Sequence, residues 1–507
     1  MLEKLYTIKL PLDDRRKKLY IQGNFIQREE HINVEKGKIV DLGTYFNAFS
    51  IKKWKQYTSL EKLQLHLFLH GEFYIEVYGI YRDKEKILIK DCCKGNYIAD
   101  IGLQGTDMQL VGVRLKALSE EALCSGGEYR GRFADERDIK IGITICTFKR
   151  EKYLFRNLKL LENLVISNPD FNILVIDNGR TIEQKNTDWL RIIHNPNFGG
   201  SGGFARGLIE QVNQGENNYV LLMDDDILIE TSALERLYSL CRHMREMYRG
   251  DMISGAMLSM DRPCIQFENT AYWGRIRMHA SGRGFDLTNQ KTLWENENLP
   301  QKRNRYGAWW FCCIPLETVK KNGYPLPVFI KGDDIEYGLR SRCNFITMNG
   351  IGVWHETFIK KQNVVMEFFN DRNMLIINHY AEGCNRWTFL FAVFGRFGRR
   401  ILRGNTEGIR RLELAIRDHG SGLEGITAVP SDEKFRQVQN YHGRKNILLS
   451  LGITFLKGMH QFLFYGTIDK TYKEFREKKL RDQSFWRKFL GIECSVRAYE
   501  KYIRNGI

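Results

Sequence analysis

Cysteine pairs that could cross-link the chain are missing from this sequence. Its 507 residues include 11 cysteines, but no Cys-x-x-Cys pair and no regular spacing. Two adjacent pairs, Cys92-Cys93 and Cys312-Cys313, are poorly suited to a disulfide framework. We therefore expect reduced, mostly buried thiols and a reducing compartment.

Long hydrophobic runs are also missing. No uninterrupted apolar run approaches the roughly 18 residues that a membrane-spanning helix needs, and the longest candidates, near residues 387–394 and 447–456, are too short. No apolar core or small-residue cleavage site follows Met1, so we expect no signal peptide. These absences predict a cytoplasmic protein, or one that lies peripherally on the inner face of the cell membrane.

Common phosphate-binding signatures are absent too. No Gly-Lys-Ser/Thr follows a glycine-rich turn, and no G-x-G-x-x-G follows the first strand expected for the α/β region. A glycine cluster, Gly199-Gly200-Ser201-Gly202-Gly203, does precede an expected helix at about 204–214. A flexible loop and a phosphate cradle at the helix N-terminus are equally good interpretations of this cluster alone.

Charge of one sign dominates the C-terminal quarter. The net charge is +16, and residues 386–507 contain 24 Lys and Arg against 12 Asp and Glu. Such asymmetry predicts an acidic partner. No nucleic-acid recognition motif accompanies the charge, so we expect no nucleic-acid partner. Cations interleaved with aromatics, as at residues 485–490, suit an anionic membrane surface or the solvated face of an ordinary helical domain.

Short strands dominate residues 1–136. Apolar residues recur at period two over 63–69 and 73–80, and no long amphipathic helix competes with them. We predict a β-sandwich or jelly-roll domain whose core contains Tyr45, Phe46, Trp54 and Phe68. The glycine-rich stretch within 121–138 is expected to be a linker.

Strands alternate with helices in the next part of the chain. Strands are expected at 139–147, 171–176, 190–193 and 219–224, with helices at 151–166 and 204–214. This order predicts a doubly wound nucleotide-binding domain over residues 137–385. The remainder, 386–507, is expected to form a basic helical domain.

An acidic triplet, Asp224-Asp225-Asp226, follows the fourth of these strands. Ligands bind at the carboxyl edge of open α/β sheets, and three adjacent like charges favour an occupant that is cationic. A hard divalent ion such as Mn²⁺ or Mg²⁺ is the simple candidate. A solvated acidic turn is the alternative.

Three features later in the sequence could act together with the acidic triplet. The adjacent Trp309 and Trp310 would point to opposite faces of a strand, so one of them is a candidate sugar platform as well as a candidate core residue. Asp333-Asp334 begins a helix, where the pair could be a simple cap. His355 ends another strand. Together they suit sugar transfer from a nucleotide donor, with a cation for the diphosphate and a separate carboxylate as base.

The ordered set resembles the family 2 glycosyltransferases of the GT-A fold, and within them the bacterial galactofuranosyltransferases. The resemblance rests on residues 147–150, 195–204, 223–226, 309–310, 333–334 and 354–355, and on the layout of a β domain, a GT-A domain and C-terminal helices. One departure is Gly332, where this branch led us to expect an aromatic residue.

The resemblance implies a role for each matching position. Asp224, Asp226 and His355 would be the metal ligands, Asp334 the general base with Asp333 beside it, and Trp309 and Trp310 the acceptor wall. Residues that would face the donor nucleotide are Thr147, Arg150, Asp177, Asn197, Gly200, Ser201, Gly202, Asp224 and Asp225. The family is inverting, which implies a single displacement.

The expected function is therefore metal-dependent transfer of galactofuranose from UDP-galactofuranose to a glycan or lipid-linked acceptor for cell-surface polysaccharide. UDP-glucose, UDP-galactose and dTDP-rhamnose remain alternative donors, and a non-catalytic carbohydrate-binding scaffold is the alternative of another class. We also expect a homo-oligomer.

Overall fold

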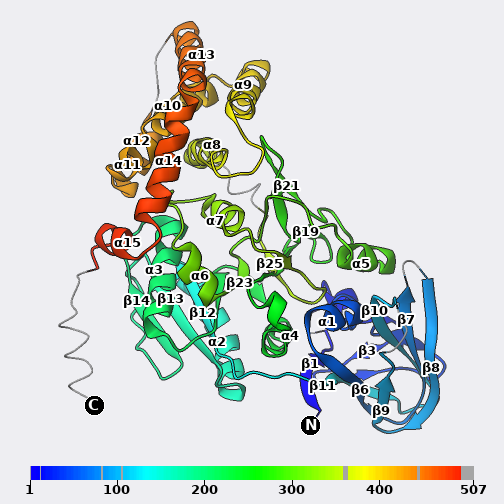
Figure 1. The fold of residues 1–507 in the computed structure, drawn as a ribbon. Helices are drawn as coiled ribbons and strands as arrows, with labels where there is room; N and C mark the ends of the chain where they lie inside the picture. Colours follow the sequence, from blue (N-terminus) through cyan, green and yellow to red (C-terminus); the bar gives the residue numbers. More distant parts are fainter. Residues whose placement is uncertain are drawn as a thin grey trace, which may run out of the picture.

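The computed structural model describes residues 2–11, 13–81, 84–103, 107–357, 363–441 and 446–492. Figure 1 shows an N-terminal β region, a central α/β region and a C-terminal group of helices, in that order along the molecule. The central region lies between the other two, so its sheet edges are within reach of both.

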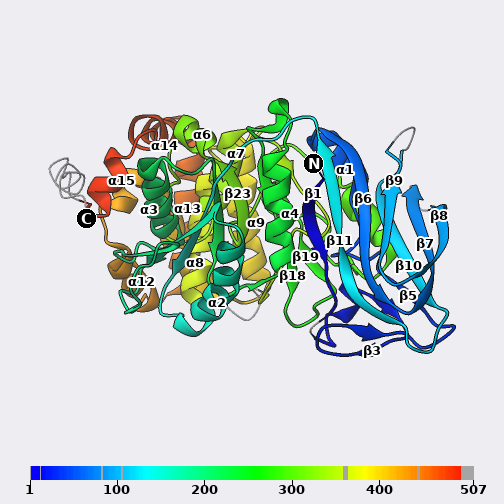
Figure 2. The same ribbon diagram turned by 90° about the horizontal axis from the view of Figure 1, so that it is seen from below.

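Two antiparallel sheets form the N-terminal region (Figure 2). One has the order β3-β4-β11-β6-β9, with β1 on β11, and the other the order β2-β5-β10-β7-β8. The long strands are β6 (Leu60–His70), β7 (Glu72–Tyr81), β8 (Lys84–Lys94), β10 (Leu110–Ala117) and β11 (Leu123–Phe133). The others are β1 (Glu3–Ile8), β2 (Gln22–Gly23), β3 (Ile26–Gln27), β4 (Ile32–Asn33), β5 (Ile39–Asp41) and β9 (Tyr97–Ile101). The expected β-rich character is confirmed.

Register decides which aromatic residues of this region are buried. Tyr45, Phe46 and Trp54 are buried, as predicted, but Phe68 is 41% exposed. In β6 the leucines at positions 63, 65, 67 and 69 point inward, so the even-numbered Phe68 must face out. The prediction of Phe68 as a core residue was wrong.

The expected linker at 121–138 is also wrong over most of its length. Residues 123–133 form β11, which pairs with β1, β4 and β6. Its glycines permit close approach of neighbouring backbone: a Cβ on Gly126 would lie 2.4 Å from the carbonyl oxygen of Ile8, and one on Gly127 would lie 2.2 Å from that of His66. They therefore fit a bulged, crowded strand.

A seven-stranded sheet of order β14-β13-β12-β15-β23-β17-β24 organises the central region. Its strands are β12 (Ile141–Thr147), β13 (Phe171–Asp177), β14 (Leu190–His194), β15 (Tyr219–Asp224), β17 (Met252–Ser254), β23 (Phe311–Pro315) and β24 (Phe345–Ile346). The first four are mutually parallel, and β23 runs antiparallel to β15. All four predicted strands are confirmed, and their carboxyl ends share one edge.

Two smaller sheets and several helices complete this region. The sheet β16-β25-β18-β19 joins Leu228–Ile229, Gly352–His355, Ala256–Ser259 and Gln266–Glu268; the sheet β21-β20-β22 joins Met278–Ala280, Ala271–Trp273 and Arg305–Tyr306. The helices are α2 (Glu151–Ser167), α3 (Gly199–Gln214), α4 (Thr231–Arg242), α5 (Gln290–Glu297), α6 (Leu316–Asn322) and α7 (Asp333–Ser341); α1 (Ile51–Tyr57) belongs to the N-terminal region.

The C-terminal region is helical, as predicted. Its helices are α9 (Arg386–Leu402), α10 (Thr406–Gly420), α11 (Gly422–Thr427), α12 (Ser431–Gln439), α13 (Ile447–Leu463), α14 (Tyr465–Lys479) and α15 (Ser484–Phe489). Helix α8 (Val364–Ile377) precedes them and packs against α10 through a shared apolar cluster. Figure 1 shows α15 returning to α3, where Phe489 and Phe198 have ring centroids 4.5 Å apart.

Within the described residues, no single helix is long and apolar enough to cross a membrane. Helices α13 and α14 meet that requirement only as a pair, and the pair is bent by 72°.

Candidate active site

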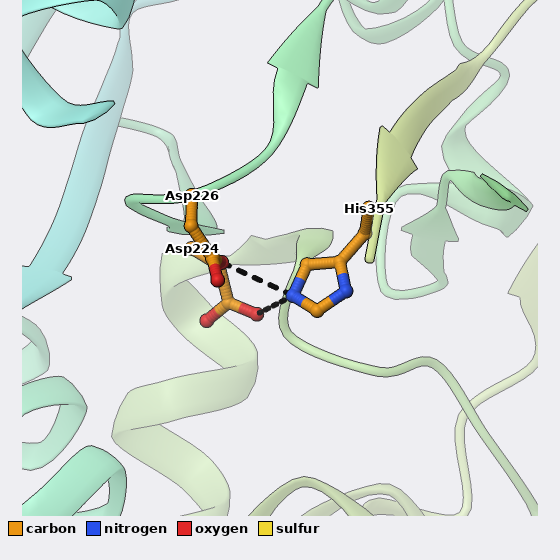
Figure 3. Close-up of side chains that lie close together, drawn as sticks. All are labelled: Asp224, Asp226 and His355. Atoms are coloured by element: carbon orange, nitrogen blue, oxygen red, sulfur yellow. Dashed lines mark ion pairs between the residues drawn. The ribbon is translucent and has the colours of Figure 1, made fainter. Parts of the chain in front are cut away.

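Three predicted metal ligands come together at the carboxyl edge of the central sheet. Asp224 ends β15, Asp226 follows in the turn, and His355 ends β25 (Figure 3). One ligand atom of each lies within 4.8 Å of the others, with His355 Nε2 3.1 Å from Asp226 Oδ1 and 3.8 Å from Asp224 Oδ2. The three form a group that could hold a metal ion.

The tautomer of His355 suits this role. Its Nδ1 lies 2.6 Å from the carbonyl oxygen of Glu356, which can only accept a hydrogen bond. Nδ1 must therefore carry the proton, and a neutral ring presents its lone pair at Nε2, toward the two carboxylates. A backbone carbonyl that fixes the outer nitrogen is the usual support of a metal-binding histidine.

Asp225, the middle residue of the triplet, is not a member of this group. Its carboxylate accepts a 2.6 Å hydrogen bond from Thr147 Oγ1, and burial raises its pKa to about 7. Arg150 forms an ion pair with Asp226 and lies 3.6 Å from Asp225 Oδ1. Thr147 and Arg150 thus hold the acidic turn in place, and their predicted contact with a nucleotide stays a prediction.

The glycine cluster lies inside α3, which begins at Gly199, five residues earlier than expected. A Cβ on Gly203 would lie 2.1 Å from Cys146 Sγ, and one on Gly207 2.3 Å from Thr144 Cγ2. The glycines therefore let the helix pack closely on β12, which the sequence pattern alone did not reveal.

Ser201 is committed to the protein interior. Its hydroxyl donates to the carbonyl oxygen of Leu326, and its N–H donates to that of Phe329 at 3.2 Å. The N–H of Gly202 bonds the carbonyl of Phe198 at 3.1 Å. Both N–H groups are therefore bonded within the protein, and the predicted contact of Ser201 and Gly202 with a nucleotide stays a prediction. Gly200 remains placed for contact at the site, since a Cβ on it would lie 3.6 Å from Asp333 Oδ2.

Asp177 and Asn197 shape the loops at the same edge. Asp177 is completely buried and accepts hydrogen bonds from three backbone N–H groups, those of residues 179, 181 and 182. Asn197 accepts a 3.1 Å bond from the N–H of Gly199. Their predicted nucleotide contacts are untested, and the geometry gives Asp177 the role of a loop anchor.

Sequence reasoning missed an amide network beside them. Asn195 donates to Asn178 Oδ1 at 2.8 Å, and Asn178 donates to the carbonyl of Gly199 at 3.0 Å. Both asparagines come directly after strands, at positions 178 and 195, which is the signal that could have identified them.

Trp309 and Trp310 form a turn before β23 and do not lie within a strand, so the prediction that they point to opposite strand faces was wrong. They are 5% and 6% exposed. Trp309 packs edge-on against Phe204 and Tyr337, and Trp310 Nε1 donates to the carbonyl of Gly255 at 3.0 Å. Their core role is clear, and a wall for an acceptor remains a prediction.

The second acidic pair opens α7 without capping it in the usual way. The N-cap position is Gly332, which has no side chain to cap the helix, and Asp334 Oδ1 accepts a 2.8 Å bond from the N–H of Ile335. Burial, together with nearby charge that includes Asp224, raises the pKa of Asp333 to about 8 and that of Asp334 to about 7. The two acidic clusters are therefore close enough to interact electrostatically.

The backbone that delivers this pair is strained. Phe329, Lys331 and Gly332 have φ values of 73°, 62° and 95°, although only glycine adopts such values freely. Asn373 on α8 holds the segment by donating to the carbonyls of Ile330 and Lys331 at 2.7 and 2.8 Å. The positive φ also gives a physical reason for glycine at position 332, where an aromatic residue was expected.

Glu268 is a buried carboxyl group that sequence reasoning did not single out. It lies at the end of β19, is 2% exposed, and its Oε1 has no hydrogen-bond partner among the described residues. Burial, together with the nearby charge of Asp334, raises its pKa to about 8. Its signal in the sequence is weak, since one glutamate in a polar stretch is ordinary.

Two family models match parts of this chain. Residues 9–114 match the family model "Galactofuranosyltransferase 2 N-terminal", and residues 143–248 match "Glycosyl transferase family 2". Galactofuranosyltransferase GlfT2 of Mycobacterium tuberculosis is 24% identical over 418 residues, covering 72% of this chain and 63% of that protein. GlfT2 of Mycolicibacterium smegmatis is 25% identical over 408 residues, covering 72% and 62%.

This chain thus spans less than two thirds of the length of these curated relatives. The resemblance found in the sequence is confirmed: residues 143–248 match the family 2 glycosyltransferase model, and a helical region follows later in the chain.

Among solved structures, mannosyltransferase PcManGT of Pyrobaculum calidifontis, described in complex with GDP-Man and Mn²⁺, is 9% identical with a TM-score of 0.33. The matched region covers 65% of this chain and 88% of the mannosyltransferase chain. S. aureus TarS 1–349 in complex with UDP is 13% identical with a TM-score of 0.36, covering 67% and 92%.

Proposed function

We propose that the chain is a metal-dependent, inverting glycosyltransferase that moves galactofuranose from UDP-galactofuranose to a glycan or lipid-linked acceptor in cell-surface polysaccharide synthesis. One observation carries the proposal. The Asp224, Asp226 and His355 group and the Asp333-Asp334 pair lie at one sheet edge, close enough for Asp224 to raise the pKa of both members of the pair. The first group would bind the nucleotide donor and the second would activate the acceptor; we call them the donor half and the acceptor half of the site.

The donor half fits a divalent cation. Two carboxylates and an imidazole with its lone pair directed at them are a suitable donor set for Mn²⁺. Asp224, Asp226 and His355 would hold the ion, and Arg150 fixes the turn that carries Asp226. When bound, such an ion supplies positive charge against the leaving diphosphate.

The acceptor half fits a general base. Asp334 is a half-buried carboxylate with a raised pKa, so it is a stronger base than an exposed aspartate. It would take the proton of an acceptor hydroxyl as that oxygen attacks the anomeric carbon. Direct attack in a single displacement inverts the anomeric centre.

Support for galactofuranose comes from the names of the matched relatives. The alternative donors differ in the sugar and, for dTDP-rhamnose, also in the nucleotide. Incubating the protein and Mn²⁺ with UDP-galactofuranose, UDP-glucose, UDP-galactose and dTDP-rhamnose, and measuring nucleotide release, separates these cases. We expect release from UDP-galactofuranose above the other donors. Release from another donor would replace the sugar, and no release or transfer with any donor would favour the non-catalytic scaffold.

Membrane association at the inner face of the cell membrane belongs to the same proposal. Helix α13 buries small and polar residues, Ser450, Thr454, Gly458 and Gln461, and exposes five large apolar ones, Leu448, Leu449, Phe455, Leu456 and Leu463. With α9, which it contacts through Phe394 and Phe455 at 5.2 Å between ring centroids, it forms an apolar ridge. We define this ridge as Trp387, Phe391, Leu402, Leu448, Leu449, Phe455, Leu456 and Leu463, all 47–88% exposed.

A phospholipid bilayer is the occupant that this ridge fits best. The exposed Arg386, Arg399 and Arg403 lie on α9 or directly after it, beside the apolar residues. The arginines could bind lipid phosphates while the apolar residues contact the acyl chains. Figure 1 places α9 and α13 at the end of the molecule far from the N-terminal sheets. This end of the molecule could therefore contact a bilayer while the N-terminal sheets stay away from it.

Point substitutions test the ridge better than truncation, because α8 would lose its packing against α10. Leu448→Glu with Leu456→Glu should abolish sedimentation with anionic vesicles, while the matched control, Ile166→Glu with Met247→Glu, should sediment like the wild type. The control residues are equally exposed, at 72% and 76%. If the ridge variant sediments like the wild type, the bilayer is rejected as the occupant. A variant that keeps its sedimentation but changes its oligomeric state would indicate a second copy of the chain as the occupant.

Two further predictions stay proposals. The paired antiparallel sheets of the N-terminal region are consistent with a sandwich of the jelly-roll type. A homo-oligomer is the second, and sedimentation equilibrium would test it.

A further inference from the structure

A large pocket lies between the active-site region and the apolar ridge. Its volume is about 740 Å³, and it is bounded by α8, α9 and residues 276–278 at β21. The residues described above as the catalytic and metal groups do not line it. The pocket is therefore a separate site.

Positive charge dominates its lining. Six cationic side chains face two carboxylates, those of Glu367 and Asp371. The cationic residues are Arg277, Lys331, Arg396, Arg399, Arg400 and Arg403.

Only two of the arginines are neutralised by the carboxylates. Arg400 pairs with Asp371 and, at 2.7 Å, with Glu367; Arg396 pairs with Asp371 at 3.3 Å. The other four cations form no ion pair with the part of the chain that the structure describes. Four cations without an ion pair around one cavity favour a multiply charged anion.

Two lining residues connect the pocket with its neighbours. Lys331 stands two residues before Asp333, on the strained segment that delivers the acidic pair. Burial lowers the pKa of Lys331 in spite of the charge of Asp371, so an anion beside it would favour its charged form. Phe391, on the opposite wall, is 63% exposed and belongs to the apolar ridge. The pocket thus adjoins both the catalytic segment and the membrane-facing surface.

We propose that this pocket binds the phosphate or diphosphate group of a lipid-linked acceptor whose hydrocarbon chain lies along the apolar ridge. The anion would be held by Arg277, Lys331, Arg399 and Arg403. Each arginine can donate two parallel hydrogen bonds to two phosphate oxygens, and the lysine adds a positive charge. The glycan end of the same acceptor would then extend past Lys331 toward Asp334. This inference rests on the proposed function for the identity of the acceptor.

Binding can be measured without turnover, which separates this inference from the proposed function. The full chain would be sedimented with three kinds of vesicle: phosphatidylcholine alone, phosphatidylcholine with a polyprenyl diphosphate, and phosphatidylcholine with phosphatidylglycerol at matched surface charge. Soluble inorganic diphosphate would be added as a competitor. The test variant is Arg399→Ala with Arg403→Ala, and the control, Lys86→Ala with Lys159→Ala, removes two exposed charges elsewhere.

We expect the wild type to bind polyprenyl diphosphate vesicles about tenfold more tightly than phosphatidylglycerol vesicles, and inorganic diphosphate to remove that preference. The test variant should lose the preference, since each charge-assisted contact is worth about tenfold or more. The control should keep it. Equal binding to both anionic vesicles, or a preference that survives in the test variant, would overturn the proposal. The first result would indicate recognition of ordinary anionic headgroups only.

Because both test arginines are exposed, the variant should fold normally, and its melting temperature checks this. If it is destabilised, the single substitution Arg277→Ala, in a different element, provides an independent test with the same vesicles. Failure of sugar transfer together with retained diphosphate preference would count against the proposed function and leave the pocket assignment standing.

Discussion

Replacing Asp334 by asparagine tests the acceptor half of the site with little structural change. The amide oxygen of asparagine can still accept the 2.8 Å bond from the N–H of Ile335, and the side chain keeps its size. What is lost is the basic carboxylate. General bases contribute about 10²–10⁴-fold, so kcat should fall about a hundredfold or more, which corresponds to about 3 kcal/mol of barrier.

The pH dependence of the same variant gives a second test. The pKa of Asp334 is raised to about 7 by burial and by nearby charge, and a base acts only when ionised. Wild-type kcat/KM should therefore rise as pH increases to about 7 and then level off. The residual rate of Asp334→Asn should lack this acidic limb.

Transfer to an acceptor would be measured beside calorimetric binding of UDP with Mn²⁺, which should change little. Asp432→Asn, the same chemical change in the first turn of the exposed helix α12, is the matched control and should be active. Turnover of Asp334→Asn close to that of the wild type would remove Asp334 from the mechanism.

Three other substitutions examine other parts of the site. Asp226→Ala should abolish the Mn²⁺ dependence of UDP binding in calorimetry, and unchanged binding would reject the metal-ligand assignment. Asn373→Ala removes the bonds that hold the strained segment, so kcat should fall about tenfold or more while Mn²⁺-dependent UDP binding persists; equal losses in both would indicate general unfolding. The raised pKa of Glu268, about 8 against 4.5, stabilises the fold at low pH, and this contribution is lost as pH rises through about 8. The free energy of unfolding of Glu268→Gln, relative to that of the wild type, should accordingly increase between about pH 5 and pH 9, by at most about 4 kcal/mol. A difference that does not depend on pH would contradict the raised pKa of Glu268.

Strand periodicity and the residues at strand ends supported the most accurate predictions from the sequence. Asp224 and His355 were placed at strand ends by their apolar neighbours alone, and the structure brings them together with Asp226. Asp224 ends one of the parallel strands, whose carboxyl ends share one edge of the central sheet. His355 comes to the same place from the smaller sheet β16-β25-β18-β19, and that approach was not predictable from the strand order.

Features that depend on close backbone approach were not predictable in the same way. The glycines of β11 were interpreted as a linker, and those of α3 as either a flexible loop or a phosphate cradle. In the fold they are required by crowding, against Ile8 and Cys146 for example, and that crowding exists only once the elements have packed. Trp309 failed as a strand residue for a related reason, since a turn before β23 cannot be recognised from apolar residues alone.

Metal binding at the edge of the central sheet provides the most direct test of the proposed function. Crystals of the protein grown with Mn²⁺ and UDP would be examined by anomalous diffraction at the manganese edge. We expect one strong peak coordinated by Asp224, Asp226 and His355, with the diphosphate of UDP bound to the same ion. A peak elsewhere, or UDP bound away from these three residues, would contradict the assignment of this site to nucleotide-sugar chemistry.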